Sequence, residues 1–239
     1  MRRVGSGKRI DIGLQMLFKV GSVAAIGGAA LLLVATSMHP MNADPADAAA
    51  AFREYAADRF WVATHLGQFC GIGLIFVGLY ALRQSLADSR AAWLSDLGFY
   101  FAVATLATAA VVQAVDGVAL KVMVDHWAAA PEAQQQPRFE AAFAVRQIEI
   151  GAASLLQLLF GSAGVLFGVA MSASTAYPAW LGWVAVASGI GTAAGGVLTA
   201  MTGFSAVAMN VTMPFTLVML AWIVAVGILM WRRPSGMDW

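Results

Sequence analysis

Six stretches of the chain are long, apolar and nearly free of charge, and more polar segments separate most of them. These stretches cover residues 20–38, 60–82, 91–115, 150–171, 179–201 and 214–231. A helix needs roughly 20 apolar residues to cross the hydrocarbon core of a bilayer, and each stretch is close to that length. The pattern predicts an all-α, polytopic membrane protein with six transmembrane helices, in which residues 1–239 form a single helical-bundle domain.

Two shorter segments carry their own signals. Residues 44–59 are rich in alanine and charge, and they predict a short amphipathic helix at the outer surface, with Asp44 as its N-cap and Pro45 in its first turn. Residues 202–213 lack charge but are too short to span. We expect them to lie at the interface or to fold back into the protein, because lipid does not tolerate bare backbone, and we expect Pro214 to open the last span.

The composition supports a lipid environment. The chain is 60% hydrophobic and only 11% charged, whereas a soluble domain is about 25% charged. A net charge of +1 gives no reason to expect a nucleic-acid partner, so the predicted partner is the bilayer. The single cysteine, Cys70, excludes an intramolecular disulfide and a cysteine-based zinc site.

The distribution of basic residues predicts the orientation. Positive side chains favour the cytoplasmic loops. With the N-terminus inside, nine Lys and Arg side chains fall on the inner side and five on the outer side, so both termini are expected in the cytoplasm. The inner set is Arg2, Arg3, Lys8, Arg9, Lys19, Arg83, Arg90, Arg232 and Arg233, and the outer set is Arg53, Arg59, Lys121, Arg138 and Arg146.

Three short motifs carry a resemblance. The pair His39–Pro40 follows the first span, DRFWVATHLGQ covers residues 58–68, and YPAWLGWVAVASGI covers residues 177–190. Together they resemble uncharacterised bacterial multi-pass membrane proteins that are grouped only as a domain of unknown function. The resemblance implies a bundle of about six spans in the bacterial inner (plasma) membrane. It implies no catalytic residues.

Polar side chains gather at the predicted outer ends of three spans. Since residues three apart share a helix face, His65 pairs with Gln68, and Gln113 pairs with Asp116. Ionisable groups within spans usually face the bundle interior, where they often mark function. The alternative is structural, with edge charges reaching headgroup water and Arg146 pairing with Asp116 or Glu149. The candidate ligand-binding residues are His65, Gln68, Gln113, Asp116, Arg146, Glu149 and Gln157.

These residues leave three functions open. In the first, an outward-facing pocket between the second, third and fourth spans binds or transports a small polar-headed or lipophilic molecule, with Arg146 meeting an anionic or polar head. In the second, the protein is an accessory or scaffold subunit without a ligand. In the third, it is a membrane-embedded enzyme with Asp116, Glu149 and His65 as acid–base groups. The sequence indicates no oligomeric state.

The three histidines offer an alternative reading as metal ligands. No metal or cofactor is predicted in the main interpretation. However, His39, His65 and His126 all fall on the predicted outer side, and Met38 and Met41 add two thioethers beside His39. Imidazole and thioether ligands suit copper, and histidines on facing helices can hold haem. This reading would make the protein an oxidoreductase.

Glycines recur four residues apart within the spans, for example at Gly67 and Gly71 and at Gly164 and Gly168. This spacing is typical of close helix packing in membranes. A hinge for transport is the functional alternative.

Overall fold

The computed structural model describes residues 4–233, which form eight α-helices and one π-helical segment. The elements are α1 (Val4–Ser37), α2 (Ala48–Ala57), α3 (Trp61–Ser85), α4 (Ala92–Val112), η1 (Gln113–Leu120), α5 (Lys121–Ala128), α6 (Glu132–Ser172), α7 (Ala179–Thr202) and α8 (Ala206–Trp231). Within the described range, six helical segments are long and apolar enough to cross a membrane, so the six-span, all-helical prediction is confirmed. Arg2 and Arg3 lie outside the described residues.

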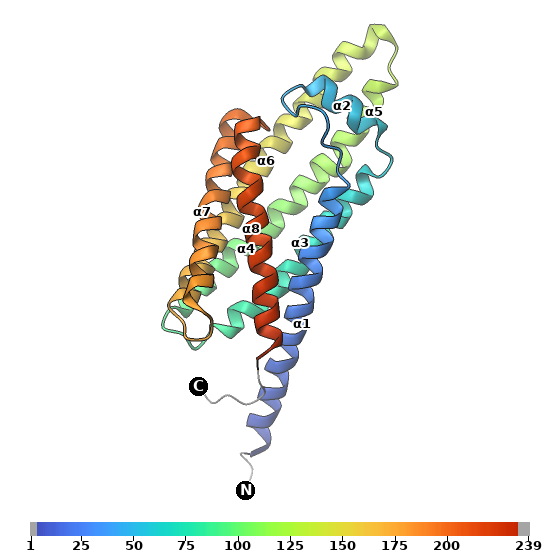
Figure 1. Cartoon of the computed structure of the whole chain (residues 1–239). Helices are drawn as coiled ribbons and strands as arrows, with labels where there is room; N and C mark the ends of the chain where they lie inside the picture. The colour runs from blue at the N-terminus through green and yellow to red at the C-terminus, as the bar shows by residue number, and fades with distance from the viewer. Residues whose placement is uncertain (1–3, 234–239) are drawn as a thin grey trace.

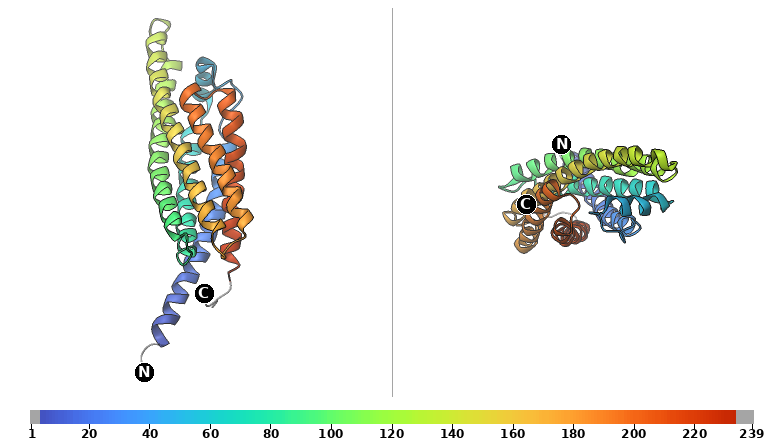
Figure 2. Two further views of the ribbon diagram at one scale, coloured as in Figure 1. Left: turned by 90° about the vertical axis from the view of Figure 1, so that its left-hand side faces the viewer. Right: turned by 90° about the horizontal axis from the view of Figure 1, so that it is seen from above.

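The six spans form a ring. Each packs against the next in the cyclic order α1, α3, α4, α6, α7 and α8, and α8 packs back against α1. Figure 2 shows this arrangement from above. Large apolar side chains such as Trp93, Tyr100 and Ile190 point outward and are exposed, as a lipid-facing surface requires.

Close backbone contacts at glycines hold neighbouring helices together. A Cβ atom on Gly71 of α3 would lie 2.8 Å from the backbone nitrogen of Leu32 in α1. A Cβ on Gly189 of α7 would lie 2.6 Å from the carbonyl oxygen of Gly161 in α6. These positions tolerate only hydrogen, which supports the packing interpretation of the glycine-rich spans.

The two ends of the ring differ. Figure 1 shows α2, the loop before it, α5 and the start of α6 gathered at one end, which we name the α2 end. The helix α1 begins and α8 ends at the opposite end, where Leu82, Leu86, Met171 and Met230 are buried in the apolar core. The polar residues discussed below therefore lie toward the α2 end, whereas the opposite end contains an apolar core.

Several predicted boundaries were wrong. Gly203 ends α7 with a φ of 66°, and the Ser205 hydroxyl accepts from the Ala208 nitrogen at 3.3 Å, so α8 begins at Ala206 and runs through Pro214. Residues 206–213 are thus part of the sixth span and do not form a separate interfacial segment. The cause is local, because the Ser205 N-cap starts the helix before the proline is reached.

The remaining differences concern the α2 end. The N-cap of α2 is Asp47 and not Asp44, since its carboxylate accepts from the Ala50 nitrogen at 3.0 Å. The short helix itself is present as expected. The fourth spanning helix begins at Glu132, directly after Pro131, so it extends well before the charge-free stretch 150–171 and includes Pro137.

Candidate functional site

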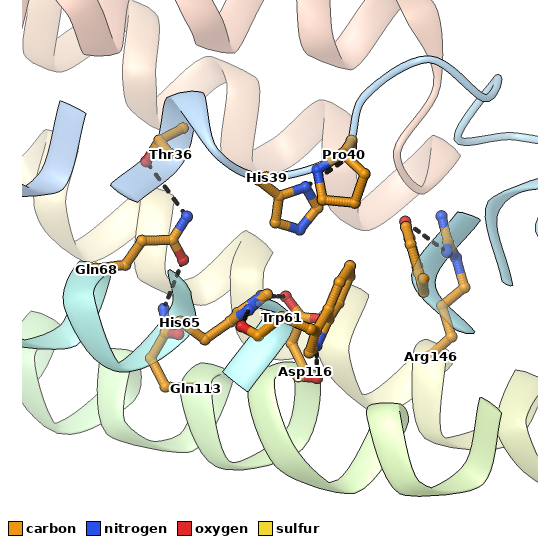
Figure 3. Close-up of polar contacts among 10 residues, drawn as sticks. Thr36, His39, Pro40, Trp61, His65, Gln68, Gln113, Asp116 and Arg146 are labelled. Carbon is orange, nitrogen blue, oxygen red and sulfur yellow. Dashed lines mark hydrogen bonds and ion pairs between the residues drawn. The ribbon is translucent and has the colours of Figure 1, made fainter. Parts of the chain in front are cut away.

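The centre of the site is a contact between His65 in the first turns of α3 and Asp116 in η1. The Nε2 atom of His65 lies 2.8 Å from Oδ2 of Asp116, and its Nδ1 atom lies 2.7 Å from the carbonyl oxygen of Trp61. The indole of Trp61 in turn donates to the carbonyl oxygen of Asp116 at 3.0 Å. Both side chains are largely buried, so the pair is fixed from both helices (Figure 3).

The π-helix explains how the two helices meet. The helical rod from Ala92 to Ala128 changes to π-helical winding over Gln113–Leu120, and π segments within α-helices often coincide with functional sites. Within η1, Gly117 faces His65, and a Cβ there would lie 2.7 Å from the Cβ of His65. The absence of a side chain at this position therefore lets the imidazole reach Asp116.

Two glutamines extend the network toward α1. The Gln113 amide donates to Gln68 Oε1 at 3.4 Å, and the Gln68 amide donates to the Thr36 hydroxyl at 3.3 Å (Figure 3). The structure thus brings together four of the predicted residues, His65, Gln68, Gln113 and Asp116. Thr36 was missed, because a threonine near the end of an apolar helix carries no distinctive signal.

His39 joins this group from the loop after α1. Its Nδ1 atom bonds the carbonyl oxygen of Pro40 at 2.9 Å, and its ring centroid lies 5.2 Å from that of His65. Burial lowers the pKa of His39, with Asp116 opposing this effect, so the neutral imidazole is favoured. One ligand atom from each of His39, His65 and Asp116 lies within 4.8 Å of the others. His126, on α5, does not belong to this group, so the structure does not bring the three histidines together at one metal site.

Arg146 has a structural setting that the sequence did not predict. It is 2% exposed and donates to the Tyr55 hydroxyl at 3.1 Å and to the Pro45 carbonyl at 2.8 Å. Its guanidinium also lies over the rings of Phe52 and Phe204. Among the described residues its hydrogen bonds go to these neutral groups and it has no ion pair. The structural alternative, in which Arg146 pairs with Asp116 or Glu149 or reaches headgroup water, is therefore wrong in its details.

Glu149 and Tyr55 complete this side of the site. Glu149, one turn from Arg146 on α6, is buried, and its Oε2 atom has no hydrogen-bond partner. Burial raises the pKa of Tyr55, although Arg146 acts against the shift, so the phenol stays protonated. Tyr55 was missed because its role depends on α2 folding back over the bundle, and nothing in the local pattern around it indicates that contact.

Gln157 lies apart from the others. Its Oε1 atom accepts hydrogen bonds of 3.3 Å from Thr199 of α7 and from Thr212 of α8. It therefore ties α6 to two neighbouring spans. The candidate residue lines the same cavity as His65, but its contacts belong to a different part of the wall.

Residues of all six spans line a cavity of about 360 Å³, which we name the chamber. On α3 the chamber extends from His65 to Leu79, which is roughly 21 Å along a helix axis. Its walls are mainly apolar, and its ionisable side chains, His39, His65 and Asp116, lie at the α2 end. Its other lining residues are Leu32, Thr36, Gln68, Ile72, Ile75, Phe76, Ala102, Thr105, Leu106, Val112, Gln113, Leu156, Gln157, Phe160, Thr192, Phe204, Thr212 and Thr216.

A second cavity of about 340 Å³, the vestibule, lies between α2, its preceding loop and the start of α8. Glu54, Tyr55 and Glu149 line it. The chamber and the vestibule share five lining residues, namely Thr36, His39, Gln68, Asp116 and Phe204. The His65–Asp116 group therefore lies where the two cavities adjoin, with Asp116 lining both of them. Arg146 lines neither of them.

Comparison with known families gives one match. Residues 98–228, from the middle of α4 to near the end of α8, match the family described as "Domain of unknown function (DUF4386)". The matched range includes Gln113, Asp116, Arg146, Glu149 and Gln157. Comparisons with curated proteins and with solved structures found no match.

Proposed function

The chain belongs to the DUF4386 family, a domain of unknown function, and we propose that this multi-pass membrane protein binds an elongated amphiphilic molecule inside its ring of helices. The apolar tail occupies the chamber, and the polar head lies at the group formed by His65, Gln68, Gln113 and Asp116. The observation that carries the proposal is the chamber itself, because all six spans line it and its ionisable groups lie at one end only.

The volume and the lining fit such a ligand. Small-molecule sites are typically clefts of roughly 300–1,000 Å³ with mostly apolar walls and a few converging polar groups. The chamber is about 360 Å³ and narrow, since it follows α3 from His65 to Leu79. A scaffold protein would gain stability from filling this space with side chains, because membrane helices associate through close packing.

The buried polar atoms define the head group. Oδ1 of Asp116 and Oε1 of Gln113 belong to chamber-lining residues, are buried and have no hydrogen-bond partner. Both are acceptors, and a buried acceptor without a partner costs about 1–3 kcal/mol. A head that donates hydrogen bonds, such as a hydroxyl or an amine, satisfies them. Arg146 is already engaged by Tyr55 and Pro45, so an anionic head finds no free cation there.

The vestibule supplies the route of entry. It joins the chamber at His39 and Asp116, while the buried core at the opposite end closes the chamber below Leu79. Binding from the α2 end needs no rearrangement of that core, whereas transport across the membrane does. We therefore place binding before transport. The α2 end faces the outside of the bacterial plasma membrane in this proposal.

A set of three amphiphiles with one tail tests the proposal. Binding of radiolabelled dodecanol, dodecylamine and dodecanoate is measured in the presence of a chelator with the purified protein in nanodiscs, against empty nanodiscs. We expect the alcohol and the amine to bind at least ~10-fold more tightly than the carboxylate, which corresponds to one unsatisfied buried group. Equal partitioning of all three into loaded and empty nanodiscs rejects the proposal.

A matched pair of variants assigns the binding to the chamber. Ala102 of α4 is 4% exposed and lines the chamber, whereas its neighbour Val103 is 42% exposed on the outer surface. Ala102→Phe fills the chamber and is expected to abolish binding, while Val103→Phe leaves it unchanged. Loss in both variants, or in neither, places the binding elsewhere.

A further inference from the structure

We infer that His39, His65 and Asp116 form a site for one divalent transition-metal ion of the zinc class. The three residues come from the loop after α1, from α3 and from η1, and no two of them are closer than 26 positions in the sequence. The site stands at the junction of chamber and vestibule. The inference does not depend on the proposed amphiphile, since metal binding can be measured alone.

The donor atoms are close enough for one ion. One ligand atom from each residue lies within 4.8 Å of the other two. Zinc bonds of 2.0–2.2 Å place neighbouring tetrahedral donors roughly 3.4 Å apart. A bound ion therefore requires the donors to shift by no more than about 1.4 Å relative to one another. We assign most of this shift to His39, because it lies on a loop, whereas His65 and Asp116 lie on helices.

The hydrogen bonds of the two imidazoles prepare them as ligands. Nδ1 of His39 lies 2.9 Å from the Pro40 carbonyl, and Nδ1 of His65 lies 2.7 Å from the Trp61 carbonyl. A carbonyl oxygen only accepts, so each Nδ1 carries the proton. In a neutral ring this leaves the lone pair on Nε2. Metal-binding histidines commonly donate their other N–H to a backbone carbonyl in this way.

Both Nε2 atoms face the same space. Nε2 of His65 lies 2.8 Å from Oδ2 of Asp116, and Figure 3 shows the second ring nitrogen of His39 directed toward the same pair. If His65 is neutral, a lone pair on Nε2 and a carboxylate oxygen confront each other, and a cation between them removes the repulsion. Without a metal, the same contact requires an additional proton on His65 or on Asp116.

The carboxylate and its surroundings fit a divalent ion. Oδ1 of Asp116 is buried without a partner, and the Trp61 indole holds the backbone of Asp116 at 3.0 Å. The buried Glu149 lines the vestibule together with Asp116. Two histidines and one carboxylate are the ligand set of zinc sites that keep a fourth position open, and also of non-haem iron sites. All three residues line the chamber, so an additional ligand of the ion would come from the chamber.

This inference differs from the three-histidine reading of the sequence. His126 on α5 is replaced by Asp116, and the thioethers of Met38 and Met41 are not needed. A set with two imidazoles and a hard oxygen donor favours zinc or iron over haem and over a thioether-bound copper site. The single cysteine, Cys70, lies on the exposed surface of α3 and takes no part.

Metal binding to purified protein tests the inference. The affinity tag is removed, the protein in nanodiscs is treated with a chelator and dialysed, and Zn²⁺ is titrated against a competing chromogenic chelator. We expect one Zn²⁺ per chain. Each of His39→Ala, His65→Ala and Asp116→Asn is expected to weaken binding by at least ~100-fold, since even indirect ligand partners account for 10–100-fold. His126→Ala is the matched control and should leave the affinity unchanged.

Two further readouts make the result decisive. Co²⁺ in place of Zn²⁺ should give visible absorption of a four-coordinate ion in the wild type and in His126→Ala, and not in His65→Ala. Thermal unfolding of each variant in chelator shows whether the variant still folds. His39→Ala is expected to disturb the fold least, because His39 lies on a loop. The absence of stoichiometric Zn²⁺ binding by the wild type, or full affinity in His65→Ala, overturns the metal site and leaves a proton-linked His65–Asp116 pair. Neither result affects the amphiphile experiment, which is carried out in chelator.

Discussion

The guanidinium of Arg146 donates a 3.1 Å hydrogen bond to the hydroxyl of Tyr55, although 91 positions separate the two residues. This contact joins the fourth spanning helix to the short helix α2. A second bond of 2.8 Å reaches the Pro45 carbonyl, so Arg146 holds both the loop and the helix that roof the vestibule. Arg146 therefore connects the helical bundle to α2 and to the loop before it.

Replacing Arg146 by methionine is expected to destabilise the protein by about 3 kcal/mol. Hydrogen bonds to a charged group contribute roughly 1.5–3 kcal/mol each, and the buried carbonyl of Pro45 is left without its partner. Tyr55→Phe, which removes one of these bonds, should cost about half as much. Thermal unfolding in detergent measures both variants.

A charge swap separates this interpretation from simple ion pairing. If Arg146 and Glu149 stabilised the fold as an ion pair, the double variant Arg146→Glu with Glu149→Arg would recover the wild-type melting temperature. We expect no recovery, because the bonds of Arg146 go to Tyr55 and Pro45, which do not move with the charge. Restoration by the swap would show that the pairing dominates.

Gly117 offers a precise test of how the π-helix positions the site. A Cβ at this position would lie 2.7 Å from the Cβ of His65, so Gly117→Ala should displace the imidazole from Asp116. We expect loss of Zn²⁺ affinity and a lower melting temperature. Gly151→Ala on α6 is the control, since a Cβ there meets nothing within 4 Å and alanine is favoured over glycine in a helix by up to about 1 kcal/mol. Equal behaviour of the two variants would contradict the role given to Gly117.

The spans were predictable from the sequence, whereas the site was predictable only in part. Long apolar runs gave six spans, because a bilayer demands length and hydrophobicity that few other structures need. The i,i+3 spacing correctly put His65 with Gln68 and Gln113 with Asp116 on shared faces. In the structure the pair on α3 and the pair on η1 contact each other at one depth in the bundle.

What escaped prediction depends on contacts between distant segments. No local pattern marks the π-helical turn of Gln113–Leu120, which depends on packing against α3 and α6. His39 joins the site because the loop after α1 folds over His65, and Tyr55 reaches Arg146 because α2 folds back in the same way. A hydropathy pattern identifies helices, but it contains no information on how a polar loop closes over them.

We predict that ionisation of the buried Tyr177 lowers the stability of the protein in alkali. Its hydroxyl lies 2.7 Å from the Ser85 hydroxyl, between α6 and α7 at the end opposite α2. Burial raises the pKa of Tyr177 above its ordinary value of 10.0, while Arg233 acts in the opposite direction. The unfolded chain therefore loses this proton first as the pH rises.

The sign of the pH effect follows from that order. The contribution of the neutral phenol is fully present below pH 10.0 and is lost as the pH rises toward the higher pKa of the folded state. The melting temperature of the wild type should fall in this window more steeply than that of Tyr177→Phe. Tyr100→Phe, at an exposed position on α4, should follow the wild type. If Tyr177→Phe is as sensitive as the wild type, ionisation of Tyr177 does not control the alkaline limit.

The orientation in the membrane can be tested by cysteine labelling. Lys19, Arg83, Arg90 and Arg232 lie toward the end opposite α2, and a basic end normally faces the cytoplasm. In a Cys70→Ser background, an impermeant maleimide added to intact cells should label Gln135→Cys near the start of α6. It should label Asp88→Cys, between α3 and α4, only after the cells are opened. The reverse result would place the vestibule on the cytoplasmic side, so that an amphiphile and a metal ion would have to reach the chamber from within the cell.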